Sequence, residues 1–119
     1  MTGFVVFGHG SRVESANQAV RDVAAQLASK GELMVEAAFL ELGEPALGAA
    51  VDALAARGAS RVVVIPYFLT LGTHLQRDLP KLIAESAGRH RSIAIKMTAP
   101  LDGHPALLEA LLDRAAQTR

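Results

Sequence analysis

The stretch FVVFGHGSR, residues 4–12, is a short apolar run that leads into a histidine flanked by two glycines. Its four consecutive apolar residues predict a buried strand over 3–7, and a helical pattern follows directly. Gly8 and Gly10 lack a Cβ, so the backbone can turn sharply and leave His9 at the carboxyl end of the strand. Ligands bind at this edge in open α/β sheets. Taken alone, the motif favours an ordinary strand-to-helix turn in which His9 has no role.

The remainder of the chain repeats this alternation of strand and helix. Apolar residues at three- and four-residue spacing predict the first helix, which Ser11 or Ser15 is expected to cap. Pro45 is expected in the first turn of the second helix, where its missing N–H costs nothing. The further strands are expected over 33–40, 61–68 and 92–97. The helices are expected over 14–29, 45–57, 74–87 and 104–116.

The stretch RVVVIPYF, residues 61–68, has the strongest strand pattern. Its β-branched run without alternation predicts burial on both faces, as in the middle of a parallel sheet. Pro66 cannot donate a ladder hydrogen bond, so regular pairing is expected to end near it. Four successive βα units with short connections therefore predict an α/β fold. We expect a mostly parallel open sheet with helices on both faces, in a flavodoxin-like layering.

Length and composition restrict the functional classes. The chain has 119 residues, of which 50% are apolar, enough for one compact domain over 1–119. Twelve basic and twelve acidic residues give zero net charge without a strongly basic stretch, which argues against nucleic-acid binding. Cysteine is absent, which excludes disulfides, thiolate zinc sites and cysteine nucleophiles. Because no apolar run has membrane-spanning length and no targeting segment is recognisable, we expect no membrane association and a cytoplasmic location.

Histidines gather at one edge of the predicted sheet. The loops after parallel strands share an edge, so His9, His74 and His104 are expected there, each at the start of a helix after a strand. Glu41 follows the second strand at the same edge. His90 lies at the opposite end, where we expect a solvated surface residue. This convergence of three of the four histidines is the main indication of a functional site.

Imidazoles without thiolates suit a borderline divalent ion such as cobalt, nickel, iron or zinc. Two neutral histidines leave coordination positions open, which favours a metal in transit over a structural one. The same imidazoles could act as general bases near neutral pH. For His9 and His74 we favour a functional role, whereas His104 is equally suited to capping or packing a helix start.

Three charged residues at this edge have both a functional and a structural interpretation. Arg12, near a helix N-terminus, could bind a substrate carboxylate together with main-chain N–H groups, or remain a solvated arginine. Asp78 could orient an imidazole or interact with the positive end of a helix. Glu41 could act as an acid, a base or a first ligand for an incoming metal, although a loop carboxylate is more often just exposed.

Five segments of the chain match the pattern of a known family, and their order and spacing are specific although each is weak alone. The segments are VFGHGSR at 6–12, FLELGEP at 39–45, VVVIPYFL at 62–69, GTH at 72–74 with Asp78 and Pro80, and APL at 99–101 with His104 and Pro105. Together they resemble the small class II chelatases of the sirohydrochlorin cobaltochelatase and ferrochelatase type, in their short CbiX form. The resemblance covers nearly the whole chain, and it implies a chelatase-like layering of the sheet and its helices.

This resemblance implies insertion of a divalent metal into sirohydrochlorin, a tetrapyrrole rich in acetate and propionate groups, for cobalamin, siroheme or related tetrapyrrole biosynthesis. It implies that His9 and His74 bind the metal, which is cobalt, iron or nickel, and assist loss of the pyrrole protons. Glu41 is expected as a further proton acceptor. The metal is a substrate, and no organic cofactor is expected.

The resemblance also implies how the macrocycle is held. Short members of the family work as homodimers, in which two facing sheet edges would enclose a flat macrocycle. Arg12 is expected to bind its peripheral carboxylates. The residues expected to contact the substrate are Gly10, Ser11, Arg12 and Thr73.

Two other functions fit parts of the pattern. A histidine phosphatase would use His9 as a nucleophile, but Gly8 stands where the phosphate-binding arginine of such an enzyme would be. A non-catalytic metal carrier or tetrapyrrole-binding module would use the same histidines as a chelatase. Turnover is the property that separates these last two.

Overall fold

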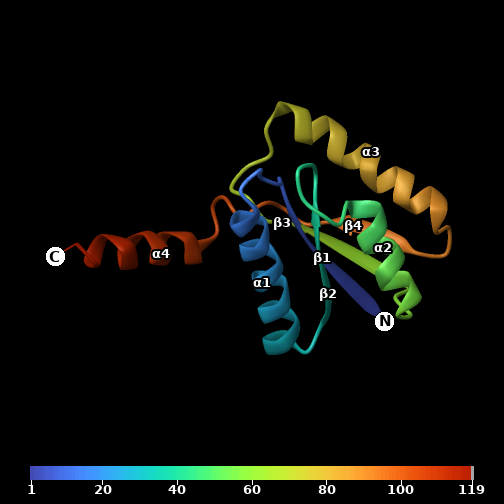
Figure 1. Ribbon diagram of the computed structural model, residues 1–119, viewed down its shortest axis with the longest axis horizontal. Helices are drawn as coiled ribbons and strands as arrows, with labels where there is room; N and C mark the ends of the chain where they lie inside the picture. The colour runs from blue at the N-terminus through green and yellow to red at the C-terminus, as the bar shows by residue number, and fades with distance from the viewer. Residues whose placement is uncertain (119) are drawn as a thin grey trace.

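The computed structural model describes residues 1–118, apart from the side chain of His74. Strands and helices alternate along the chain as the sequence predicts. The strands are β1 (Thr2–Gly8), β2 (Met34–Phe39), β3 (Arg61–Pro66) and β4 (Ala94–Met97). The helices are α1 (Glu14–Gly31), α2 (Leu47–Ala56), α3 (Thr73–Arg89) and α4 (Pro105–Ala116). The strands form one parallel sheet in the order β2-β1-β3-β4, which confirms the predicted α/β fold (Figure 1).

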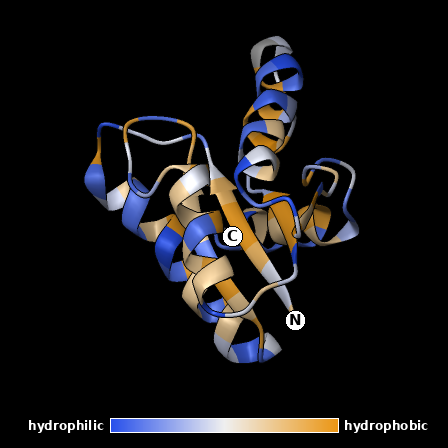
Figure 2. Ribbon diagram, turned by 90° about the vertical axis from the view of Figure 1, so that its right-hand side faces the viewer, coloured by the Kyte–Doolittle hydropathy of each residue, from blue (hydrophilic) through white to orange (hydrophobic). Residues whose placement is uncertain are grey.

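The larger core lies between the sheet and the helices α2 and α3. Val5 and Phe7 of β1 and Val62 and Val64 of β3 are completely buried in it, together with Leu54 of α2. Burial of these apolar side chains is the main force that holds the helices on the sheet. In Figure 2 the strands are largely orange, while the helices alternate between orange and blue along their length. No helix in the described part of the chain has the length and hydrophobicity needed to cross a membrane.

The opposite face of the sheet is only half covered. α1 packs there on β1 and β2 and buries Val6, Ala24 and Ala37. Ile65 of β3 lies beside Val6 on this face, and both it and Val63 are only partly buried. The prediction that β3 is buried on both faces is therefore wrong for this face. The reason is that, in the described part of the chain, no helix covers these two side chains.

α4 projects away from the sheet instead of packing on either face (Figure 1). None of its described residues is buried, and Leu108, Leu111 and Leu112 are 61%, 67% and 58% exposed. The radius of gyration is 15.0 Å, compared with about 13.5 Å for a compact chain of this length. The predicted covering of both faces therefore holds for α1 on one face and for α2 and α3 on the other, but not for α4.

Two local predictions at helix starts are wrong. Pro45 does not lie in α2, because it follows a cis peptide bond from Glu44 and precedes the first helical residue. α1 begins after Val13, which is its N-cap residue and makes no side-chain cap. Ser11 lies too early to cap the helix, and its Oγ accepts a hydrogen bond from the N–H of Val13 instead. Ser15 lies inside the helix.

An ion-pair cluster ties the end of α3 to α2. His90 Nε2 and Asp52 Oδ1 are 2.6 Å apart, and Arg89 also pairs with Asp52. The hydrogen bond with His90, aided by the charge of Arg89, lowers the pKa of Asp52 below its ordinary value. His90 has 24% of its side chain exposed. It is therefore a structural partner of Asp52 and not the solvated surface residue that the sequence predicts.

Candidate functional site

The loops that follow β1 and β2 are joined through their backbones at the carboxyl edge of the sheet. The N–H of Leu40 donates to the C=O of Gly8 (3.0 Å), and the N–H of Glu41 donates to the C=O of His9 (3.2 Å). These bonds extend the pairing of β1 with β2 beyond the strands themselves. The backbone of His9 is therefore held against the neighbouring loop.

Gly10 makes the close approach of these two loops possible. Its φ of +98° lies in the left-handed half of conformational space, which residues with a Cβ rarely adopt. A Cβ on residue 10 would lie 1.6 Å from the carbonyl oxygen of Glu41. Only glycine fits here, because the obstacle is a main-chain atom and not a flexible side chain. The sharp turn expected at Gly10 is confirmed, and its cause is a contact with another loop.

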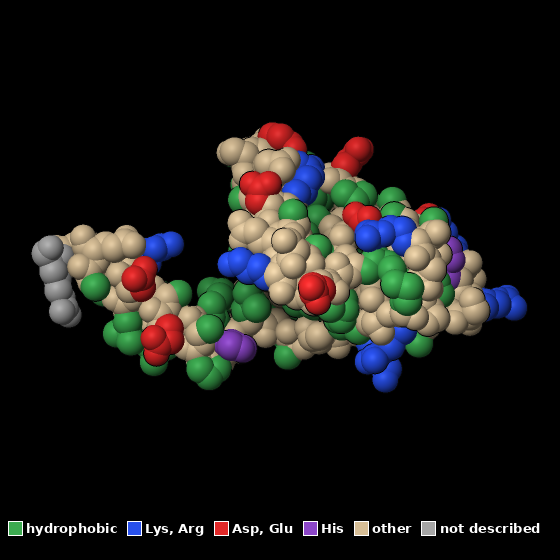
Figure 3. Space-filling view, turned by 90° about the horizontal axis from the view of Figure 1, so that it is seen from below, with side chains coloured by type: hydrophobic (Ala, Val, Ile, Leu, Met, Phe, Trp, Pro, Cys, Tyr) green, Lys and Arg blue, Asp and Glu red, His purple; other side chains and the backbone are tan. Residues whose placement is uncertain are grey.

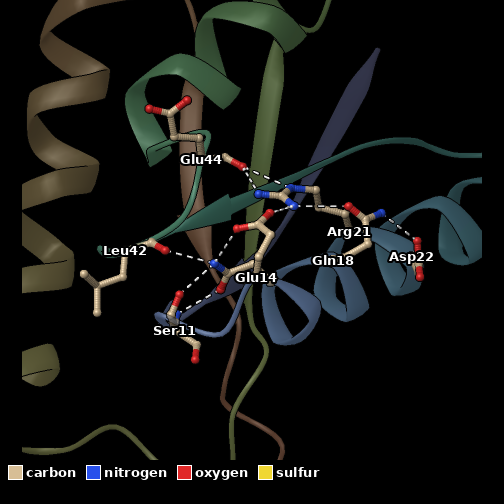
Figure 4. Close-up of polar contacts among 8 residues, drawn as sticks. Ser11, Glu14, Gln18, Arg21, Asp22, Leu42 and Glu44 are labelled. Carbon is tan, nitrogen blue, oxygen red and sulfur yellow. Dashed lines mark hydrogen bonds and ion pairs between the residues drawn. The ribbon is translucent and has the colours of Figure 1, made fainter.

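Asn17 of α1 joins the same two loops, and the sequence analysis does not predict this role. The residue is 1% exposed. Its Oδ1 accepts from the N–H of Ser11 (2.9 Å), while its Nδ2 donates to the C=O of Ser11 (2.8 Å) and to that of Leu42 (2.9 Å). In Figure 4, dashed lines from the main chain of Ser11 and from the carbonyl oxygen of Leu42 meet at one side chain between the two loops. Asn17 therefore fixes the positions of both loops through a single buried amide.

Arg21, one turn further along α1, holds the loop after β2. Its Nη1 pairs with Glu14 Oε1 (2.6 Å), and its Nε and Nη2 donate to the C=O of Glu44 at 3.1 and 2.9 Å (Figure 4). The guanidinium also lies over the ring of Phe39, 5.3 Å from its centroid. Hydrogen bonds from Arg21 and then from Asn17 lower the pKa of Glu14. This contact set keeps the loop against α1.

The polar side chains predicted to act on a ligand are exposed at this rigid edge. His9, Arg12 and Glu41 are exposed, and none of their side chains makes a hydrogen bond or ion pair within the described part of the chain. Ser11 is half-buried, with its main chain held by Asn17. The β1–α1 loop thus combines a fixed backbone with side chains that are available to a ligand.

The second predicted histidine lies at the start of α3, at the same edge of the sheet. Thr73 is the first residue of the helix and is exposed. His74 follows in the first turn, but its side chain lies outside the described residues. One turn later, Arg77 Nε and Asp78 Oδ1 are 3.3 Å apart. That His74 binds a metal with Asp78 behind it stays a prediction.

His104 caps α4. Its Nδ1 accepts a hydrogen bond from the N–H of Ala106 (3.0 Å), and Pro105 occupies the first helical position. Capping is one of the two roles that the sequence left open for this residue.

Two hollows flank the edge of the sheet. One, of about 690 Å³, lies beside Glu41 and the loop after β2. The other, of about 490 Å³, lies between α4 and the loops after β3 and β4, where Leu69, His104 and Leu111 line it. His9 lines neither of them. Among the side chains that the structure describes, no group of three or more histidines and carboxylates is arranged to hold a metal. A ligand at His9 would therefore lie on an open edge.

The sequence model of the CbiX family matches residues 3–118, almost the whole chain. The chain belongs to the CbiX family. It is 34% identical to the sirohydrochlorin cobaltochelatase of Saccharolobus solfataricus, in a match that covers 99% of this chain and 96% of that protein. It is 37% identical to the chloroplastic sirohydrochlorin ferrochelatase of Arabidopsis thaliana, over 94% of this chain and 50% of that protein. The resemblance to the small chelatases is confirmed.

A solved structure of the family agrees with the fold of this CbiX chain. The sirohydrochlorin chelatase SirB from Bacillus subtilis subspecies spizizenii, in complex with cobalt, superposes with a TM-score of 0.87 at 29% identity. The superposition covers 98% of this chain, so it includes α4, and 50% of the Bacillus chain. The chain thus spans about half the length of the Arabidopsis and Bacillus proteins.

Proposed function

We propose that this CbiX protein is a chelatase that inserts a divalent metal ion into sirohydrochlorin. The observation that carries the proposal is the β1–α1 loop, where His9 is exposed on a backbone fixed by Gly10 and Asn17. A rigid loop whose imidazole makes no hydrogen bond within the described structure suits a metal ion that must both bind and leave. Membership of the family over 3–118 supports the same function, since the relatives named above are sirohydrochlorin chelatases.

His9 and His74 hold the metal ion beside the macrocycle. Their loops follow β1 and β3, which are neighbours in the sheet, so the two residues start from adjacent positions on one edge. Imidazole ligands with open coordination positions suit Co²⁺, Fe²⁺ and Ni²⁺, and the choice among them in a cell depends strongly on availability. The ion is a substrate, and no organic cofactor takes part.

Insertion binds the metal ion to all four ring nitrogens and frees it from its earlier ligands. Two of these nitrogens lose their N–H protons, so each turnover releases two protons. Glu41 or one of the two imidazoles accepts them and passes them to solvent. The carboxylate of Glu41 suits this role because it is exposed and because the N–H of Glu41 is hydrogen-bonded to the C=O of His9, which keeps the two residues close. The reaction needs neither a redox centre nor a covalent nucleophile.

The β1–α1 loop and the start of α3 bind the macrocycle. Arg12 is exposed and unpaired within the described residues, so its guanidinium can bind the peripheral carboxylates. Gly10, Ser11 and Thr73 supply close main-chain and hydroxyl contacts. Because the edge at His9 is open, two copies of the 1–119 domain in a homodimer enclose the flat substrate between them.

A non-catalytic carrier of metal or tetrapyrrole is the second candidate. The observation that favours it is the same exposed imidazole together with the open edge, which would allow binding and release without chemistry. A carrier forms at most one metallated product per chain, whereas a chelatase forms many.

The test is the absorbance change of sirohydrochlorin with Co²⁺, Fe²⁺ or Ni²⁺ at catalytic concentrations of protein. We expect multiple turnovers with the natural sequence, and loss of the enzymatic rate in both His9→Ala and His74→Ala. His90→Ala is the matched control, because it removes a histidine that pairs with Asp52 away from the edge. A rate equal to the background with all three metals would overturn the chelatase function and leave the carrier as the better explanation.

A further inference from the structure

We propose that Leu42 is a substrate-binding residue whose side chain packs on the flat ring of the tetrapyrrole at the carboxyl edge of the sheet. The inference rests on the proposed function and adds a contact with the apolar part of the substrate, which the charged residues of the edge do not supply. Leu42 follows Glu41 in the loop between β2 and α2. The sequence analysis assigns no role to its side chain.

Leu42 has a backbone conformation that is unfavourable for a leucine. Its φ of +56° lies in the left-handed region, where a Cβ comes too close to the following carbonyl oxygen. Among the described residues, positive φ values otherwise occur only at Glu32 and at the glycines Gly10, Gly58 and Gly103. Glu32 ends α1, and its N–H bonds back to the helix, which is a common left-handed helix end. Leu42 ends no helix, so this explanation does not apply to it.

The side chain of Leu42 has no apolar environment of its own. It is 51% exposed and belongs to neither core cluster. The hollow that it borders is lined otherwise by Gly43 and by three charged residues, Glu14, Arg21 and Glu44. In Figure 4 the carbonyl oxygen of Leu42 faces the polar cluster, while its side chain points the other way. Glycine or asparagine would adopt this φ more easily and would expose no apolar side chain, so nothing within the described structure explains why a leucine stands here.

Main-chain bonds place Leu42 beside the loop that carries His9. The C=O of Leu42 accepts from Asn17 Nδ2 (2.9 Å), and the same amide bonds to the N–H and the C=O of Ser11 at 2.9 and 2.8 Å. The preceding residue, Glu41, donates its N–H to the C=O of His9 (3.2 Å). A macrocycle that presents its nitrogens to His9 therefore lies within reach of the leucine side chain.

Other exposed apolar side chains follow the neighbouring strands at the same edge. Val13 comes after β1, and Tyr67 and Leu69 come after β3, with 61%, 39% and 59% of their surface exposed. Figure 3 shows green side chains where the arm formed by α4 leaves the body of the molecule, the region in which Leu69 lines a hollow. A flat ring with carboxylates on its rim has apolar faces and an acidic border. An edge that combines apolar side chains with arginine and histidine is complementary to it.

The charges around Leu42 favour a substrate over a permanent protein partner as the occupant. Arg12 and Glu41 are exposed beside it and make no ion pair in the described structure. A protein surface that covered Leu42 would bury these charges as well, which is costly without matched partners, and interface cores are depleted of charged residues. The tetrapyrrole brings carboxylates for Arg12 and an apolar ring for Leu42 in one molecule.

The test measures binding of metal-free sirohydrochlorin by equilibrium dialysis, so that it does not depend on turnover. Leu42→Asn removes the apolar side chain and keeps the backbone, because asparagine tolerates the left-handed conformation. We expect the Kd to rise about tenfold, which corresponds to about 1.4 kcal/mol and to the burial of the exposed half of a leucine. The value of kcat/KM for metal insertion should fall by a similar factor. The loss should be the same at low and high salt, whereas the loss in Arg12→Ala should shrink as salt screens the charges.

Two control variants separate the contact from other effects. Leu42→Met keeps an apolar side chain of similar volume and should bind sirohydrochlorin within about twofold of the natural sequence. Leu33→Asn should leave the Kd unchanged, because Leu33 is an exposed leucine between α1 and β2, at the opposite edge of the sheet. In urea unfolding, Leu42→Asn and Leu42→Gly should have midpoints equal to or higher than that of the natural sequence, since both relieve the unfavourable φ.

Each outcome decides the inference separately from the proposed function. An unchanged Kd in Leu42→Asn, or a weaker binding that comes with a lower urea midpoint, would overturn the contact. A loss of mass in sedimentation of this variant would assign Leu42 to an interface between copies and would overturn it too. Tenfold weaker binding by Leu42→Asn, in a protein whose natural sequence shows no turnover, would support the contact and overturn the chelatase function. Turnover with equal kcat/KM in both proteins would do the reverse.

Discussion

Replacement of Asn17 by alanine is expected to lower the free energy of unfolding by about 2–4 kcal/mol. The side chain is 1% exposed and makes three hydrogen bonds, of 2.8, 2.9 and 2.9 Å, to the main chain of Ser11 and Leu42. Each such bond contributes about 0.5–1.5 kcal/mol net, and a buried group left without a partner costs about 1–3 kcal/mol. Water that enters from the adjacent exposed loop would offset part of this cost, so the range stays below the sum of the upper values.

Urea unfolding measures this loss. With a slope of about 2 kcal/mol per molar urea, the midpoint should fall by about 1–2 M. Gln18→Ala is the matched control, because Gln18 is the next residue of α1, is exposed, and bonds only to the side chains of Asp22 and Arg21. A surface change of this kind should alter stability by less than about 0.5 kcal/mol. In native buffer, Asn17→Ala should also slow metal insertion, because the loop that carries His9 loses its support.

Asn17→Asp separates the hydrogen bonds from the space that the side chain fills. The ionised carboxylate can still accept from the N–H of Ser11, but it cannot donate to the C=O of Ser11 or of Leu42. It would also face the carboxylate of Glu14, to which Asn17 Nδ2 donates at 3.3 Å. We therefore expect a loss of stability at least as large as that of the alanine variant, although the volume is unchanged. If the urea midpoints of Asn17→Ala and Asn17→Asp lie within about 0.2 M of that of Gln18→Ala, the reasoning is refuted.

Two further substitutions test other parts of the structure. Gly10→Ala should lower the free energy of unfolding by about 2–4 kcal/mol and abolish metal insertion, because the new Cβ would meet the backbone of Glu41. Gly58→Ala is the control, since Gly58 has the same φ of +98° but nothing within 4 Å, and it should cost only about 1–2 kcal/mol. Equal losses of the two variants in urea unfolding would contradict the clash. His90 lowers the pKa of Asp52, so this carboxylate contributes stability above its unfolded pKa of about 3.9 and loses it as the pH falls through the lower folded value. Asp52→Asn should therefore lower the free energy of unfolding by about 0.5 kcal/mol near pH 6, a small amount because the group is partly exposed, and by less below pH 4. A difference in stability between the variant and the natural sequence that grows as the pH falls would contradict this.

The elements could be predicted from the sequence because their causes are local. β3 ends at Pro66, as expected of a residue that has no N–H for the ladder. The sharp turn at Gly10 could also be predicted from the residue itself, because glycine has no Cβ. What the sequence did not show is that Gly10 meets the carbonyl of Glu41, a residue thirty-one positions away in the chain. That contact depends on how β1 and β2 pair.

The role of Asn17 could have been found from its position. Val20, Ala24 and Leu27 lie on the side of α1 that faces the sheet, and Asn17 continues their spacing by three residues toward the N-terminus. A polar residue at such a core-facing position must find hydrogen-bond partners, because a buried amide without them is costly. Ala16, in contrast, is apolar but does not lie on the side of α1 that faces the sheet, and it is exposed.

The place of α4 could not be predicted from its own residues. Its leucine stripe indicates that one side of the helix is covered, and the same stripe would fit its own sheet or that of another copy. The direction of the helix is set by main-chain bonds from Leu101 and Asp102 to the loop after β3, which no periodicity reveals. Pro45 is a similar case, because a proline before a helix suits both a first helical turn and the cis turn that is found.

The loops of the candidate site are held by hydrogen bonds to their main chain, and the charged side chains there make no stabilising contacts in the described structure. At the carboxyl edge, Asn17 and the backbone bonds of His9 hold the loops, while Arg12 and Glu41 remain exposed and unpaired in the described structure. An exposed side chain without partners contributes little to stability, so removing its functional group should leave the fold intact. His9→Ala should for this reason unfold within about 0.5 kcal/mol of the natural sequence. A loss of metal insertion in that variant can then be attributed to the imidazole itself, whereas a loss in Asn17→Ala reports the geometry of the loop.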